Sequence, residues 1–140
     1  MAYVSQELKA KLAPAIKAIC KKYKVKASIA VSNHSTLVVN IKSGPIDFVE
    51  NYIQNTKDGI ASRKLSQDQI DYLRKKQSLD VNTYWFQENY SGKSKAFLSE
   101  LIPAMNNGNW DKSDIQTDYF NVGWYIDVNV GKWNKPYELV

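Results

Sequence analysis

A β-hairpin is predicted by residues 27–41, which read ASIAVSNHSTLVVNI. Apolar residues alternate with small or polar ones from 27 to 31, and the alternation resumes from 36 to 41. A period of two places every second side chain on the same face of a strand. Between the two runs lies Ser32-Asn33-His34-Ser35. Because Asn and His accept a positive φ more readily than most residues, we expect a tight primed turn there.

A third strand is predicted by residues 124–130, which read WYIDVNV. Strict alternation divides these side chains between two faces. The first set is Trp124, Ile126, Val128 and Val130, and the second is Tyr125, Asp127 and Asn129. We expect this strand to pair antiparallel with the hairpin and helices to cover one face of the sheet. The second set then lies on the open face. Residues 80–86 are a weaker candidate, either a short strand or an aromatic-rich connection.

Apolar spacing predicts a first helix from a Ser5 N-cap to near Lys24. Pro14 lies inside the pattern and lacks a backbone donor, so we expect a kink there or a second helix starting at Pro14. Cys20 falls on the apolar face, which favours a buried thiol. A second helix is predicted to start at Pro45, with Asp47 in its first turn, and to end within residues 55–59.

Two more helices complete the pattern. Ser66-Gln67-Asp68-Gln69 is a capping box that predicts a short helix ending in Arg74, Lys75 and Lys76, three cations that suit a helix C-terminus. Residues 94–106 repeat apolar side chains at helical spacing, with Ser94 as the expected N-cap and residues 106–108 as the stop. The sequence therefore predicts one α+β domain over residues 1–140, with a small antiparallel sheet packed against about four helices.

Composition excludes several classes of protein. The chain has 140 residues, 44% of them hydrophobic, but no run approaches the roughly 18 apolar residues that a membrane span needs. The N-terminus has no basic segment followed by an apolar one, so we expect a soluble, cytoplasmic protein without membrane contact. With one cysteine and one histidine, the chain can form neither an internal disulfide nor a Cys/His zinc site, and His34 is the only candidate for a His-based triad.

The sequence contains no complete catalytic motif. Ser91-Gly92-Lys93-Ser94 resembles the end of a phosphate-binding loop, but position 87, where that motif needs glycine, is Gln87. The acidic-x-Lys pattern of metal-dependent nucleases occurs only at Glu7-Leu8-Lys9, on the first helix. His34, Asp47, Asp118 and Asp127 are polar residues that a fold could gather into a site, although their spacing does not require one. We expect a non-enzymatic protein without a metal or cofactor.

Positive charge is concentrated at the N-terminus. Residues 1–26 contain seven lysines and one glutamate, a formal charge of +6, whereas residues 27–95 carry +2 and residues 96–140 carry −3. A polyanion is the natural partner of such a segment, and we expect nucleic acid, DNA or RNA, to bind there without strong sequence preference. The candidate residues are Lys9, Lys11, Lys17, Lys21, Lys22, Lys24, Lys26, Arg74, Lys75 and Lys76. The plainer interpretation is a solvated helix face.

Aromatic residues support a second hypothesis. They make up 12% of the chain and are dense near its C-terminus. Exposed Tyr and Trp anchor protein interfaces and stack on nucleobases, although rings also fill small cores. The alternative function is therefore a protein-interaction module with a host protein as partner. Its candidate residues are Tyr125, Trp133, Tyr137 and His34. A small-molecule binder is a third possibility and requires a concave, aromatic-lined pocket.

Three segments carry a resemblance to a known family. They are residues 33–44 (NHSTLVVNIKSG), residues 46–48 (IDF) and residues 118–137, which include DYFNVGWYIDVNVGKW and KPY. These segments resemble one of the large-polyvalent-protein-associated domains of phages and conjugative elements. The resemblance implies an accessory role in mobile-element biology inside a bacterial host, such as action against host defence, and the alternative protein-interaction module would then inhibit a host defence or transcription component. It implies no catalytic residues.

Overall fold

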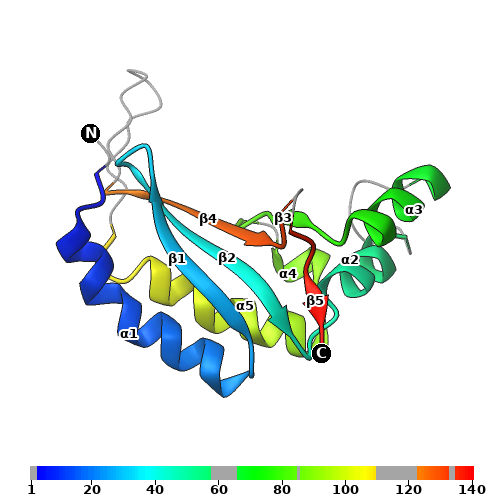
Figure 1. Ribbon diagram of the computed structural model, residues 1–140, viewed down its shortest axis with the longest axis horizontal. Helices are drawn as coiled ribbons and strands as arrows, with labels where there is room; N and C mark the ends of the chain where they lie inside the picture. The colour runs from blue at the N-terminus through cyan, green and yellow to red at the C-terminus, as the bar shows by residue number, and fades with distance from the viewer. Residues whose placement is uncertain (1–2, 58–65, 85, 110–122, 133–134) are drawn as a thin grey trace.

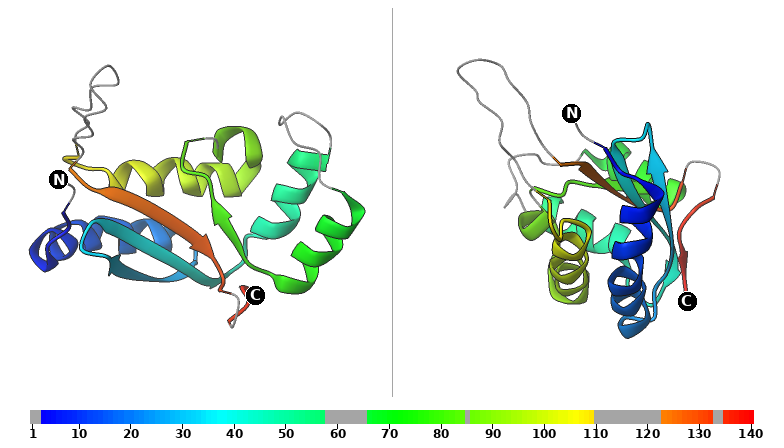
Figure 2. Two further views of the ribbon diagram at one scale, coloured as in Figure 1. Left: turned by 90° about the horizontal axis from the view of Figure 1, so that it is seen from above. Right: turned by 90° about the vertical axis from the view of Figure 1, so that its left-hand side faces the viewer.

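The computed structural model describes residues 3–57, 66–84, 86–109, 123–132 and 135–140. These residues form an α+β fold with a five-stranded mixed sheet, in the order β1-β2-β4-β3, and β5 pairs with β2. Helices α1 and α5 lie side by side on one face of the sheet, and no described helix covers the other face (Figures 1 and 2). The elements are α1 (Gln6–Lys22), β1 (Lys26–Ser32), β2 (Thr36–Gly44), α2 (Phe48–Lys57), α3 (Gln67–Lys76), β3 (Leu79–Val81), α4 (Phe86–Asn89), α5 (Gly92–Met105), β4 (Tyr125–Val130) and β5 (Glu138–Leu139).

The predicted hairpin is confirmed. Strands β1 and β2 pair antiparallel, with Ile29 opposite Val39. Asn33 and His34 both have positive φ, 53° and 59°, and the backbone N–H of Ser35 donates to the carbonyl of Ser32 at 3.2 Å. Two consecutive residues with positive φ give a primed turn, which matches the right-handed twist of the flanking strands. His34 is exposed at this turn.

The predicted orientation of the C-terminal strand is wrong. Strand β4 pairs parallel with β2, with Val39 opposite Val128, and antiparallel with the short strand β3. Parallel pairing needs a long crossover connection, and the helical segments between β2 and β4 provide one. The predicted alternation itself is confirmed, since Val128 and Val130 are fully buried whereas Tyr125 is exposed.

The helices differ from the sequence expectations mainly at their starts. Helix α1 passes through Pro14 as one helix, so no second helix begins there. Strand β2 extends to Gly44, and α2 begins only after Asp47, whose carboxylate accepts the Glu50 backbone N–H at 3.1 Å. The capping box at Ser66 is present as predicted.

Helix α5 begins at Gly92, and Ser91 rather than Ser94 precedes it. Ser94 lies inside the helix and is buried. Ser91 instead accepts hydrogen bonds from Asn51 and Asn55 of α2 at 3.0 and 3.2 Å. The weak strand candidate at residues 80–86 resolves into β3 (Leu79–Val81) and the short helix α4 (Phe86–Asn89).

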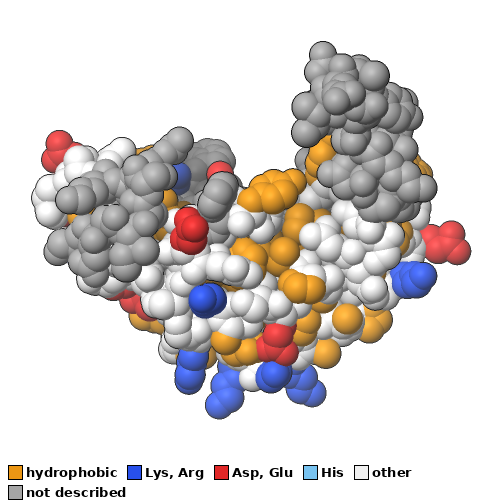
Figure 3. All heavy atoms as spheres, turned by 180° about the vertical axis from the view of Figure 1, so that it is seen from behind, with side chains coloured by type: hydrophobic (Ala, Val, Ile, Leu, Met, Phe, Trp, Pro, Cys, Tyr) orange, Lys and Arg blue, Asp and Glu red, His pale blue; other side chains and the backbone are white. Residues whose placement is uncertain are grey.

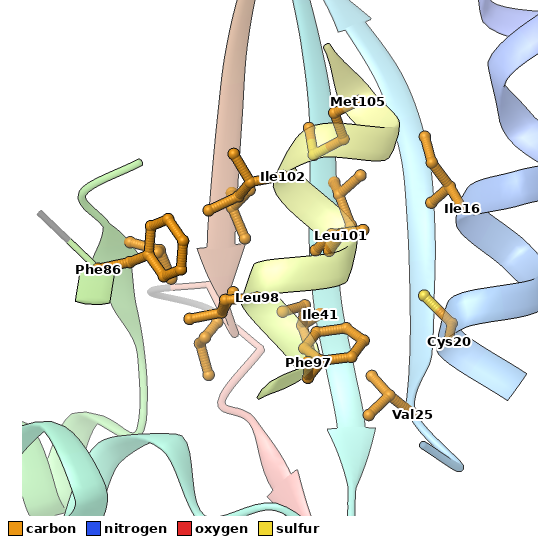
Figure 4. Close-up of a cluster of buried hydrophobic side chains, with 14 of the residues drawn as sticks. Ile16, Cys20, Val25, Ile41, Phe86, Phe97, Leu98, Leu101, Ile102 and Met105 are labelled. Atoms are coloured by element: carbon orange, nitrogen blue, oxygen red, sulfur yellow. The ribbon is translucent and has the colours of Figure 1, made fainter. Parts of the chain in front are cut away.

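The main core lies between the sheet and the pair of helices α1 and α5. Figure 4 shows Phe97, Leu98, Leu101, Ile102 and Met105 of α5 directed toward the strands and toward α1. Phe97, Leu98, Leu101 and Met105 are fully buried. A smaller cluster of Val49, Ile53 and Ile70 joins α2 to α3. No helix among the described residues is long and apolar enough to cross a membrane.

Candidate nucleic-acid interface

The lysines of α1 do not share a single face. Lys17 and Lys21 are one helical turn apart and line a groove beside β1. Lys11 and Lys22 are eleven residues apart, about three turns, and therefore lie together on another side of the helix. Lys22 contacts Glu100 of α5, with Nζ 2.9 Å from Oε1. Lys9 is half-buried. The predicted row of N-terminal lysines is thus divided between two sides of α1.

The groove between α1 and β1, which we call the helix groove, has an apolar floor and a basic rim. Its rim carries Lys17, Lys21, Lys24 and Lys26, and its floor is formed by Ile16, Cys20, Val25, Ala27 and Ile29. No acidic residue is among the described residues that line it. Burial raises the pKa of the Cys20 thiol, which keeps this sulfur protonated and unreactive at neutral pH.

A second hollow lies on the open face of the sheet, where β2 and β4 end. We call it the sheet hollow, and it has a volume of about 510 Å³. It is lined by Lys26, Ser28, Asn40, Ile41, Lys42, Ser43, Gly131, Lys132, Lys135, Pro136 and Glu138. Lys132 and Lys135 are held close because their backbone N–H groups donate to each other's carbonyls at 2.8 and 3.1 Å. The sheet hollow has no aromatic side chain among its described lining residues.

Lys26 connects the two hollows, since it lines both. Together they form what we call the lysine surface: Lys17, Lys21, Lys24, Lys26, Lys42, Lys132 and Lys135. The described lining residues contain these seven lysines and one glutamate, Glu138, a net formal charge of +6. The whole chain carries +5. Figure 3 shows the helix side of the molecule, with Lys and Arg side chains along its lower edge; the sheet hollow is on the opposite face and is not seen in this view.

Three members of the lysine surface were not among the predicted residues. Lys42 follows the buried Ile41 of β2, and Lys132 and Lys135 lie just beyond β4. Lys42 is a single lysine in its segment and Lys132 and Lys135 are only two, so no run of positive charge in the sequence indicates them. Their common position could have been found only from the parallel pairing of β2 and β4, which brings the ends of both strands to the same edge.

Two of the predicted cations are paired elsewhere. Arg74 donates two hydrogen bonds to Glu50, at 2.8 and 3.1 Å, and this partner raises the pKa of the guanidinium group. Lys22 pairs with Glu100, as described above. Lys75 is exposed. Lys76 is half-buried and lines a polar depression beside Lys132 of the lysine surface, together with Asp80 and Asp127. These two carboxylates offset the charge of Lys76, so helix α3 adds little net positive charge to the lysine surface.

The predicted aromatic surface is only partly present. Tyr125 is 48% exposed, but Tyr137 is buried and its hydroxyl donates to the Ile46 carbonyl at 2.6 Å. Burial raises the pKa of Tyr137 well above its ordinary range. Trp133 lies outside the described residues, and His34 is at the far end of the hairpin from Tyr137. The three described members, Tyr125, Tyr137 and His34, do not form a continuous patch.

The described members of the candidate polar site are not brought together either. Asp47 caps α2, Asp127 accepts a hydrogen bond from Asn129 at 3.3 Å, and His34 occupies the hairpin turn. Asp118 lies outside the described residues. Within the described ranges, no group of three His, Cys, Asp or Glu side chains is placed to hold a metal ion.

Comparisons add no relative. No known protein family, curated protein or solved structure matches the chain. The resemblance to the large-polyvalent-protein-associated domains therefore stays a prediction.

Proposed function

We propose that the protein binds nucleic acid through the lysine surface, without preference for base sequence. The observation that supports this proposal is the continuity of the two hollows at Lys26, which concentrates a charge of +6 on one part of the molecule. Nucleic acid is the polyanion whose closely spaced phosphates suit such a concentration, and its binding releases counterions. This interface differs from the predicted one, because it includes lysines from only one side of α1 and also includes the lysines at the ends of β2 and β4.

The residue types favour contact with phosphates over contact with bases. Lysine provides a point charge on a flexible stem and lacks the planar fork with which arginine reads guanine or grips a phosphate in two places. The described lining residues include no aromatic side chain on which a base could stack. Binding through this surface therefore depends on charge density and groove shape, and an accessory role in a mobile element is compatible with it.

The test is fluorescence anisotropy with labelled single- and double-stranded DNA and RNA over a salt series. The first variant is Lys24→Gln/Lys26→Gln/Lys42→Gln, within the lysine surface. The matched control is Lys11→Gln/Lys75→Gln/Lys95→Gln, which removes the same charge from exposed positions elsewhere. For single-stranded DNA, the slope of log K against log salt falls by roughly 0.7 for each phosphate that the protein no longer neutralises. We expect a fall of about 2 in the first variant and little change in the control.

Two results would contradict the proposal. Equal losses in the two variants would mean that net charge alone drives association and that the lysine surface is no site. Absence of binding by the wild type at low salt would make these lysines a solvated surface.

A further inference from the structure

Strand β1 is a long and unprotected edge of the sheet. It has seven residues, and within the described residues only β2 pairs with it. After Lys26, where its register with β2 shifts, it contains no charged residue and no proline, two of the features with which proteins usually block an exposed edge. The other edge strand is different, since β3 has three residues and carries Asp80. The sheet therefore protects one edge and leaves the other open to pairing.

The outward backbone groups of β1 can be assigned from the bonds of its neighbour. The Ser35 carbonyl, just before β2, accepts from Tyr125, and the Ile41 carbonyl accepts from Gly131, so the odd-numbered residues of β2 direct their carbonyls toward β4. Backbone groups alternate along a strand, so the even-numbered residues of β2 face β1. Because Ala30 lies opposite Val38, the even-numbered residues of β1 bond to β2. The backbone groups of Ala27, Ile29 and Val31 consequently point outward.

The helix groove lies directly beside this edge. Ala27 and Ile29 contribute their side chains to its floor, next to Ile16 and Cys20 of α1. A strand added to β1 would extend the sheet over α1, and every second side chain of that strand would point into the groove. One extended segment could therefore bond to the outward backbone groups of β1 and pack its side chains on the apolar floor of the helix groove.

We propose that the helix groove binds an extended peptide segment of another protein, which adds as a strand to β1 and has acidic residues flanking an apolar centre. Charge complementarity identifies this occupant, since four lysines and no described acidic residue line the groove. A second copy of this chain is disfavoured, because its own β1 has no acidic residue to offer these lysines. Main-chain bonds supply affinity in this mode of recognition, and the alternate side chains supply specificity.

The experiment uses a fluorescent peptide whose five central residues alternate valine and threonine and whose two ends each carry two acidic residues. The first control peptide has lysines in place of the acidic residues. The second has proline at the central valine, which removes a backbone donor and blocks strand pairing. We expect anisotropy to show binding of the acidic peptide and a loss of about tenfold or more with each control peptide.

Amide hydrogen exchange followed by NMR tests the geometry directly. Bound peptide should slow exchange at the backbone N–H groups of Ala27, Ile29 and Val31. The amides of Ser28 and Ala30 already bond to β2 and should change little. Equal binding of the proline peptide, absence of binding by the acidic peptide, or binding without protection of the three outward amides would each overturn the proposal.

Variants distinguish peptide binding from nucleic-acid binding, because the two share the groove lysines but only the peptide uses the backbone of β1 and only nucleic acid uses the sheet hollow. Ile29→Pro removes one outward donor, keeps every lysine and leaves the bonds to β2 in place, so it should lose peptide binding and bind DNA as the wild type does. Lys42→Gln/Lys132→Gln lies in the sheet hollow and should weaken DNA binding and leave peptide binding unchanged.

Lys17→Glu/Lys21→Glu changes only exposed side chains and serves as a second groove variant if Ile29→Pro unfolds. It should lose the acidic peptide, and retained binding would overturn the proposal. DNA that displaces the peptide without protecting the outward amides would show that the two ligands share charge and that only the peptide pairs with β1.

Discussion

Gly131 is the most constrained glycine in the described part of the chain. Its φ is +67°, and a Cβ there would lie 2.6 Å from the Gln77 carbonyl and 2.7 Å from the Tyr137 backbone nitrogen. We expect Gly131→Ala to lower the free energy of unfolding by roughly 2–5 kcal/mol, since it combines a left-handed residue with a clash. Urea denaturation measures this loss.

Gly92 provides the matched control for that substitution. Its φ is +56°, but a Cβ there would have no neighbour within 4 Å. Gly92→Ala should therefore cost only the left-handed penalty, about 1–2 kcal/mol. Equal losses at the two positions would show that the crowding around Gly131 does not contribute.

The hairpin turn offers a stabilising substitution. His34 has a φ of 59°, a conformation that histidine accepts more readily than most residues but less readily than glycine. His34→Gly should raise the free energy of unfolding by about 0.5 kcal/mol, because relief of that strain slightly exceeds the added entropy of the unfolded chain. His34→Ala removes the ring and keeps the strain, so thermal unfolding should show no gain. A gain in both variants would assign the effect to the imidazole ring.

The hairpin turn and Gly131 differ in how far their conformation can be predicted from the sequence. Asn33 and His34 lie between two alternating runs, so their positive φ follows from local sequence. The crowding of Gly131 depends on Gln77 and Tyr137, which belong to a helix end and to the C-terminal segment. Nothing close to Gly131 in the sequence signals their approach.

At the scale of elements, Glu100 joins α5 to α1. Its carboxylate accepts hydrogen bonds from the Tyr23 hydroxyl and from Lys22 Nζ, the latter at 2.9 Å, and these bonds lower the pKa of Glu100. A carboxyl whose pKa is lower in the folded state stabilises the fold at a pH above its unfolded pKa. That contribution is lost as the pH falls through the folded pKa. Glu100→Gln should therefore unfold at a lower temperature than the wild type at pH 7.

The difference in unfolding temperature between the wild type and Glu100→Gln should shrink in strongly acidic solution. There, Glu100 of the wild type is protonated in both the folded and the unfolded state. Thermal unfolding over a pH series measures this difference. A difference that stays constant with pH would mean that packing of the side chain, and not its charge, accounts for the loss.

Helix starts were predicted where the capping signal is local and were misplaced where a neighbouring element competes. The Ser66 capping box needs only four consecutive residues, and it forms as expected. The predicted start at Pro45 is wrong because the Asp47 carboxylate caps α2 two residues later, and the Ile46 carbonyl accepts from the Tyr137 hydroxyl instead. Likewise Ser94 is a good capping residue in sequence, but Ser91 precedes the helix, held by side chains of α2.

At the scale of the whole molecule, the direction of β4 relative to β2 cannot be predicted from the sequence pattern. Alternation along residues 124–130 is the same whether the strand runs parallel or antiparallel to β2. The choice depends on the path of the helices between the two strands. That choice also decides the site, because parallel pairing places Lys132 near Lys42 and extends the basic surface from α1 to the open face of the sheet.

The concentrated positive charge of the lysine surface should lower the stability of the whole molecule. The lysine surface places seven lysines against one glutamate, so these cations repel one another in the unbound protein. Neutralising three of them in Lys24→Gln/Lys26→Gln/Lys42→Gln should raise the midpoint of thermal unfolding by about 1–2 °C at low salt. At 1 M salt, where the screening length is about 3 Å, the gain should disappear.

The control Lys11→Gln/Lys75→Gln/Lys95→Gln distinguishes local repulsion from net charge. It removes the same three charges from separate positions, so its midpoint should change less than that of the lysine-surface variant at low salt. Equal gains would mean that net charge alone sets the effect and that the seven lysines act as independent surface residues. A larger gain at the lysine surface would show repulsion that the fold tolerates without a ligand, and bound polyanion should then stabilise the wild type more than the variant.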